Sequence, residues 1–196
     1  MKKLLFFVSI LASMSVFGSS KLFDYDLWAK DLQTMIKLNS VDNSTVEGAD
    51  KNHNQVRDDV ENYVKQKYAH DEFQKVMFLE AARKIQQILT LPKDTSKSVR
   101  RQLDKQLLQI YTCRDYILFK HDDIDLEKEL EAKNEFKSKV LNTKKRLNIY
   151  IKHKKMLPFE YSIPSDEELV QQRVSCERLY SKIKSESKKG VRITAK

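Results

Sequence analysis

Apolar residues recur every three or four positions through most of this chain, which is the spacing of one face of an α-helix. This spacing predicts amphipathic helices over 24–38, from about 58 to 68, over 73–88 and from about 98 to 117. The apolar positions are Leu27, Trp28, Leu32, Met35 and Ile36, then Val60, Tyr63, Val64 and Tyr68, then Phe73, Met77, Ala81, Ile85 and Ile88, and finally Val99, Leu103, Leu107, Ile110, Cys113 and Ile117.

A strong charge gradient marks the next segment. Residues 122–131 carry six acids and one lysine, whereas 136–159 carry eight lysines or arginines and no acid. Acids at the start and bases at the end complement the dipole of a helix. We therefore predict one long helix from 122 to about 159, with Phe136, Val140, Leu147 and Tyr150 on its buried side.

Capping residues indicate where several helices begin and end. Asp71 stands before one apolar stretch, and Pro92 follows its end. Ser165 and Glu168 have the spacing of a capping box, so a last helix is expected from 165 to about 184. With only three glycines and three prolines, the chain has little material for hairpins. The expected fold class is an all-α bundle of about five or six helices.

The N-terminal residues have the order of a secretory signal peptide. Two lysines precede an uncharged, mainly apolar run over 4–17, and small residues follow at 18–20. That run of about 14 residues is shorter than the roughly 18 of a membrane span, which favours cleavage over an uncleaved anchor. No later stretch is apolar enough to span a bilayer. A secreted or periplasmic location is expected.

The chain divides into four expected parts: a signal peptide at 1–20, an N-terminal helix and polar linker at 21–49, a helical domain at 50–184, and a disordered basic tail at 185–196. The formal net charge is +9, which falls to 9 − 2 = +7 without Lys2 and Lys3. A basic protein of this kind favours an acidic partner or surface.

The twelve residues from Asp50 to Glu61 carry the most specific pattern in the chain. Oxygen-bearing side chains occupy the first, third, fifth and ninth positions, and a glutamate occupies the twelfth. This segment resembles an EF-hand calcium loop and, with the signal peptide, resembles secreted bacterial proteins in which one such loop precedes a helical domain. The resemblance implies a calcium ligand set of Asp50, Asn52, Asn54, the carbonyl of Val56, Asp58 and Glu61.

The loop departs from the EF-hand pattern in two ways. Gln55 stands at the sixth position, where the family has a glycine for a sharp turn. No helix immediately precedes Asp50, and no second loop is present to pair with it. The alternative interpretation is a polar loop in which Asp58 only caps a helix.

Cys113 and Cys176 are the only cysteines. In an oxidising compartment a single pair predicts a disulfide, and the alternative is two buried thiols. The four histidines lack zinc spacing, and no catalytic arrangement stands out, so we expect a protein that is not an enzyme.

The strongest basic patch runs from Lys144 to Lys155. It comprises Lys144, Lys145, Arg146, Lys152, Lys154 and Lys155. Such a run usually forms a solvated helix face, and export argues against nucleic acid as a partner. The leading expectation is an exported binding or structural protein with a structural calcium site and an unknown protein partner. The alternative is a basic envelope-surface or adhesion protein that binds anionic lipid or polysaccharide.

Overall fold

The computed structural model describes residues 25–36, 45–121, 125–157 and 165–188, and these form seven α-helices with no strand. The expected all-α class is therefore confirmed, although the count exceeds the predicted five or six. The expected signal peptide lies outside the described residues. The helices are α2 (Tyr25–Met35), α3 (Asp58–Lys67), α4 (Glu72–Leu89), α5 (Lys97–His121), α6 (Leu126–Val140), α7 (Lys144–Lys155) and α8 (Asp166–Lys188).

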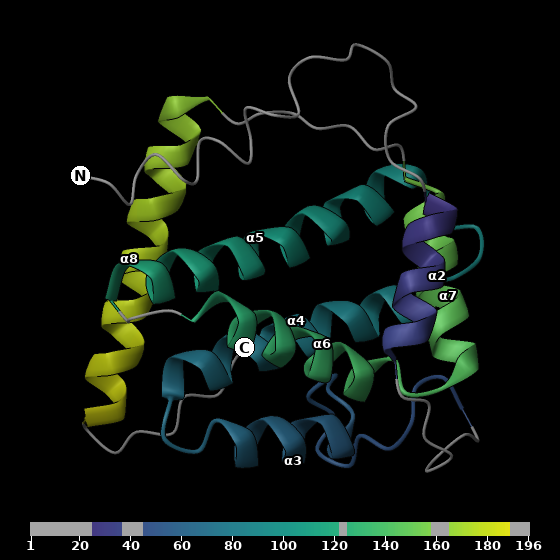
Figure 1. Ribbon diagram of the computed structural model, residues 1–196, viewed down its shortest axis with the longest axis horizontal. Coiled ribbons are helices and arrows are strands. Elements are labelled where there is room, and N and C mark those ends of the chain that lie inside the picture. Colours follow the sequence, from purple (N-terminus) through teal and green to yellow (C-terminus); the bar gives the residue numbers. More distant parts are fainter. Residues whose placement is uncertain (1–24, 37–44, 122–124, 158–164, 189–196) are drawn as a thin grey trace.

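Helix α4 is the centre of the bundle, because it packs against α3, α5, α6, α7 and α8. Helices α4 and α5 run side by side, with α8 across one end of the pair and α2 and α7 at the other end (Figure 1). The buried face of α4 includes Phe78, Ala81, Ile85 and Ile88. These residues have the spacing that predicted the helix, and they explain why α4 forms in this position.

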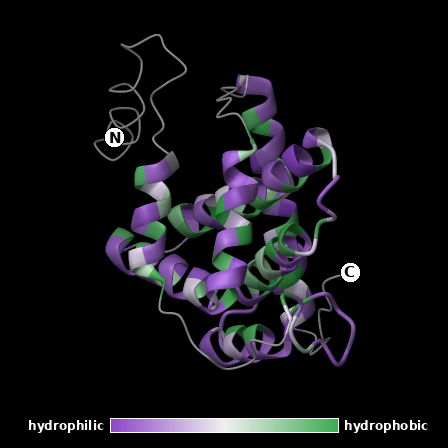
Figure 2. Ribbon diagram, turned by 90° about the vertical axis from the view of Figure 1, so that its right-hand side faces the viewer, coloured by the Kyte–Doolittle hydropathy of each residue, from purple (hydrophilic) through white to green (hydrophobic). Residues whose placement is uncertain are grey.

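Two groups of buried apolar side chains form the core. The larger group draws on α2 to α7 and includes Val64, Phe78, Ile85 and Phe136. The smaller group joins α4, α5 and α8. The helices carry hydrophobic residues on part of their surface and hydrophilic residues on the rest (Figure 2). No helix in the described ranges is both long and apolar enough to cross a membrane.

The predicted long helix from 122 to about 159 is wrong, since the structure divides it into α6 and α7. Leu141, Asn142 and Thr143 between them are all buried. The Thr143 side chain accepts a hydrogen bond from the backbone N–H of Arg146 and so caps α7. Thr and Asn compete well with helical hydrogen bonding, and the break lets both halves turn their apolar faces to the core.

The predicted capping box at the start of α8 is confirmed. The Ser165 N–H donates to Glu168 Oε2 at 2.8 Å, and the Glu168 N–H donates to Ser165 Oγ at 3.2 Å. Helix α8 continues to Lys188, so residues 185–188 of the expected disordered tail are helical. Residues 189–196 lie outside the described ranges.

The end of the expected linker is held by the α6–α7 junction. Arg146 is fully buried, and its guanidinium donates to the carbonyl oxygens of Thr45 and Val46 at 3.1 and 2.9 Å. It also donates to Asn142 Oδ1 at 2.8 Å. These bonds fix the chain just before the Asp50–Glu61 loop.

Candidate metal site in the Asp50–Glu61 loop

The loop from Asp50 to Glu61 is closed at its base by the start of α3. The backbone N–H of Asp58 donates to the carbonyl of Ala49 at 2.8 Å. Asp58, at the ninth position, also accepts the N–H of Lys51 on its Oδ1 atom at 3.2 Å. The loop therefore returns on itself before the helix begins.

The Asp50 carboxylate organises the first half of the loop. Its Oδ1 accepts the N–H of Asn54 at 3.1 Å, and its Oδ2 accepts the N–H of Gln55 at 2.8 Å. The side-chain oxygens of Asn52 and Asn54 accept backbone N–H groups two residues further on. These Asx-type turns wind the chain around the first carboxylate.

Two residues in the loop have left-handed backbone conformations. The φ angle is +66° at Gln55 and +55° at His53. Position six of the loop thus makes the sharp turn for which the EF-hand pattern uses glycine, although a glutamine stands there. A side chain in this region costs about 1 to 2 kcal/mol relative to ordinary helical geometry.

The Glu61 carboxylate, at the last position of the loop, contacts the side chains of Asn52 and Asn54. Asn54 Nδ2 donates to Glu61 Oε1 at 2.7 Å, and Asn52 Nδ2 donates to Oε2 at 3.1 Å. Lys65, one turn along α3, places its Nζ 3.0 Å from Oε1. Glu61 is only 8% exposed, so these contacts replace most of its hydration.

These contacts bring four of the six predicted ligands together. The side-chain amides of Asn52 and Asn54 both donate to Glu61, while the backbone N–H of Asn54 donates to the side chains of Asp50 and Asn52. Within the described ranges no three His, Cys, Asp or Glu residues are grouped to hold a metal ion. A cation here would therefore depend on the two asparagine amides as well as on carboxylates, which is a donor set that suits calcium.

The remaining two predicted ligands are placed differently. Val56 is buried in the larger core, which anchors the loop to the bundle. Asp58 is bonded to Lys51 and stands at the start of α3. The alternative interpretation made Asp58 the cap of this helix, but the N-cap residue is Arg57 and no side chain caps the helix by a hydrogen bond.

Three side chains that the sequence did not single out tie the outside of the loop to α4 and α6: Arg83 and Gln87 of α4, and Arg57 of the loop itself, which bonds backbone carbonyls of α6. Arg83 Nε donates to the carbonyl of Asn54 at 3.0 Å, and Gln87 Nε2 donates to Gln55 Oε1 at 2.9 Å. Arg57 donates to the carbonyls of Lys139 and Val140 at 2.7 and 3.1 Å. The only signal in the sequence was that Arg83 lies seven and four residues after the apolar Val76 and Leu79.

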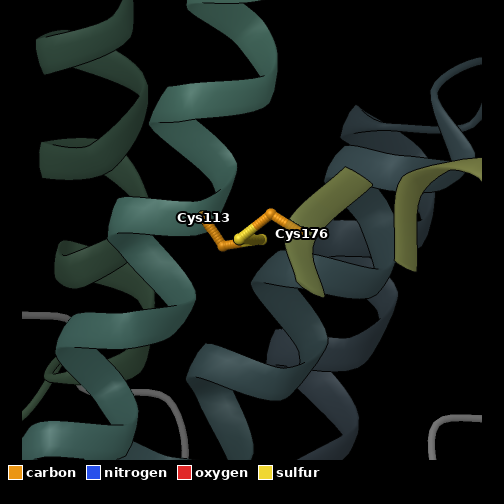
Figure 3. The surroundings of a disulfide bond; sticks show 2 residues. All are labelled: Cys113 and Cys176. Atoms are coloured by element: carbon orange, nitrogen blue, oxygen red, sulfur yellow. A yellow bond between two sulfur atoms is a disulfide. The ribbon is translucent and has the colours of Figure 1, made fainter. Parts of the chain in front are cut away.

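The predicted disulfide is confirmed between Cys113 on α5 and Cys176 on α8, with their Cα atoms 5.5 Å apart (Figure 3). Among the described residues of α8, only Ile183 is buried. Phe73 and Tyr180 pack edge to face beside the bridge, with ring centroids 5.1 Å apart. The disulfide therefore supplements a small apolar interface.

The predicted basic face on α7 is not continuous. Arg146 is buried in the junction described above, and Lys154 and Lys155 are paired with Asp104 and Asp26. Lys144, Lys145 and Lys152 are exposed, and so is Lys155. The structure thus removes Arg146 from this face and pairs Lys154 and Lys155 with acids.

Comparisons of this chain with protein-family models, with curated proteins and with solved structures each find no match. Its function must be inferred from its own residues.

Proposed function

We propose that this is an exported, non-enzymatic binding or structural protein in which the Asp50–Glu61 loop holds a structural calcium ion. The observation that supports the proposal is that the loop folds back on itself around a left-handed turn at Gln55: Asn52 and Asn54, at positions three and five, both bond Glu61 at position twelve, and Asp50, at position one, accepts the backbone N–H of Asn54. This is the order of ligands that EF-hand-type loops use.

Asp50, Asn52, Asn54 and Glu61 would hold the ion with side-chain oxygens, Val56 with its carbonyl, and Asp58 directly or through water. Calcium would supply positive charge among the three proposed carboxylate ligands, Asp50, Asp58 and Glu61. The two asparagines now direct their N–H groups to Glu61, so each amide must turn to present oxygen. That rearrangement and the small number of carboxylates favour a dissociation constant of about 0.1 to 1 mM, as in extracellular modules.

A structural role is favoured because the loop is tied to several helices. It begins α3, and its backbone and side chains are held by α4 and α6. An ion that binds the folded loop and not the unfolded chain stabilises the fold by linkage. At ten times the dissociation constant this stabilisation is about 1.4 kcal/mol.

Export is supported by the Cys113–Cys176 disulfide, since structural disulfides persist in oxidising compartments. The proposed location is outside the cytoplasm, in the periplasm or beyond the cell.

Isothermal titration with calcium, together with melting curves in calcium and in chelator, tests the metal site. We expect heat of binding, and a higher Tm in several millimolar calcium. Glu61→Gln should remove most of the binding, because the bidentate twelfth ligand is lost. Glu47→Gln makes the same charge change just outside the loop and should bind like the wild type. Absence of both binding heat and a Tm shift would reject the calcium site and favour the alternative, a polar loop that binds no ion.

A further inference from the structure

Glu61 and Lys65 form an ion pair along one face of α3. Lys65 Nζ lies 3.0 Å from Glu61 Oε1, and the two residues are four positions apart. Glu61 is nearly buried, whereas the Lys65 side chain is 52% exposed. The lysine therefore reaches the carboxylate from the solvent side and can leave without disturbing the core.

Both oxygens of Glu61 already have partners. Oε1 accepts from Asn54 Nδ2 and faces the Lys65 ammonium, and Oε2 accepts from Asn52 Nδ2. Among these three partners Lys65 alone carries a positive charge. An ion that used both oxygens of Glu61 would have to take the place of the lysine.

We propose that Lys65 is a built-in competitor for the calcium ion: its ammonium neutralises Glu61 when the loop is empty and is displaced when calcium binds. This inference rests on the proposed calcium site. It assigns Lys65 the role of an affinity-setting residue, because each binding event must break the ion pair and place a divalent ion beside the freed ammonium.

This role predicts opposite effects of one substitution in the two states. Without calcium, Lys65→Gln leaves a nearly buried carboxylate with amide partners only, so the protein should melt at a lower temperature. With calcium, the same change removes both the competing ammonium and its repulsion of the ion, so Lys65→Gln should bind calcium more tightly. A purely structural ion pair predicts a lower Tm in both states and an unchanged affinity.

The test uses calcium titration and melting of the full exported chain for four proteins: wild type, Lys65→Gln, Lys65→Arg and Lys67→Gln. Lys65→Arg keeps the charge, and Lys67→Gln removes a charge from the same helix at a lysine paired with Glu135. We expect Lys65→Gln to bind calcium about three- to ten-fold more tightly, and the other two variants to stay within about two-fold of the wild type.

Each outcome decides at least one of the two proposals. Equal affinity of wild type and Lys65→Gln overturns the role of Lys65 and leaves the calcium site standing. Binding by Lys65→Gln alone supports the competition and refutes a calcium site in the wild-type protein. If no protein binds calcium, both proposals are wrong. Tighter binding by Lys67→Gln of the same size would show a general charge effect and also overturn the inference.

Discussion

The side chain of Arg57 lies against the backbone of Gly48, where an added Cβ atom would be 2.3 Å from Cδ of Arg57. Gly48 has a φ angle of +68°, and Arg57 is 2% exposed with its guanidinium bonded to two carbonyls at the end of α6. Because those bonds hold the arginine, it has little freedom to move aside. This contact joins the entrance of the Asp50–Glu61 loop to α6.

The first prediction follows from this contact. Gly48→Ala should destabilise the protein by about 2 to 4 kcal/mol, since the new methyl group requires both a strained backbone and displacement of a buried arginine. Chemical denaturation measures this change. Glu47→Ala, at the adjacent exposed position, should change the free energy of unfolding by less than about 0.5 kcal/mol. Equal effects of the two substitutions would contradict the contact.

The second prediction concerns the left-handed turn at Gln55. Because φ is positive without any ion, the strain is present in the folded protein whether or not calcium binds. Gln55→Gly should therefore raise the free energy of unfolding in chelator by about 0.5 to 1 kcal/mol. Calcium affinity should change by less than two-fold.

A matched variant separates the turn from the contact that Gln55 makes with α4. Gln87→Ala removes the hydrogen bond to Gln55 Oε1 and leaves the backbone as it is. It should be neutral or slightly destabilising. A Gln55→Gly protein that unfolds more easily than Gln87→Ala would show that the turn carries no relievable strain.

The third prediction concerns the disulfide. The bridge spans a sequence separation of 63 residues, for which chain entropy gives at most about 4 kcal/mol of stabilisation. Replacing Cys113 and Cys176 together by alanine should lower stability by about 2 to 4 kcal/mol. Amide hydrogen exchange should accelerate first in α8, which buries little besides Ile183. Uniform acceleration across α4 and α8 would contradict a local role for the bridge.

The fourth prediction is that protein stability falls at acidic pH because of His153. Its imidazole is 2% exposed, and both ring nitrogens lack a hydrogen-bond partner in the described structure. Burial lowers the pKa of His153 from 6.5 to about 4, although Asp104, 3.8 Å away, acts in the opposite direction. As pH falls from about 6.5 to 4, His153 becomes protonated in the unfolded chain but stays neutral in the folded protein. Stability should therefore fall by about 3 kcal/mol across this window from this group alone.

His153→Leu isolates that contribution. The variant should lose about 3 kcal/mol less than the wild type between pH 6.5 and 4, as measured by denaturant unfolding at several pH values. Above pH 7 it should be as stable as the wild type or more so, since a buried polar group without partners is removed. Parallel stability curves for the two proteins from pH 7 to 4 would contradict a buried, neutral histidine.

Local patterns in the sequence determined most of the helices. Apolar spacing located α4 and α5, because a helix that buries one face needs this spacing wherever it packs. The capping box at Ser165 could be predicted because both of its hydrogen bonds lie within four residues. The disulfide followed from the count of two cysteines. The order of oxygen-bearing residues in the loop is likewise a local property, and it suffices to propose a calcium site.

Only the tertiary structure decided which charged side chains are buried and which partners they bond. Arg57 and Arg146 look like ordinary surface residues in the sequence, but both are buried. Arg57 donates to carbonyls that lie 82 and 83 residues away in the chain, and Arg146 donates to carbonyls 100 and 101 residues away. The division of α6 from α7 depends on the same packing, because a continuous charge gradient is compatible with one helix or two. The ion pair between Lys65 and Glu61 is local in sequence. Its proposed effect on calcium affinity depends on the burial of the Glu61 carboxylate. Burial and long-range hydrogen bonding set these energies, and neither is visible in the spacing of residues along the chain.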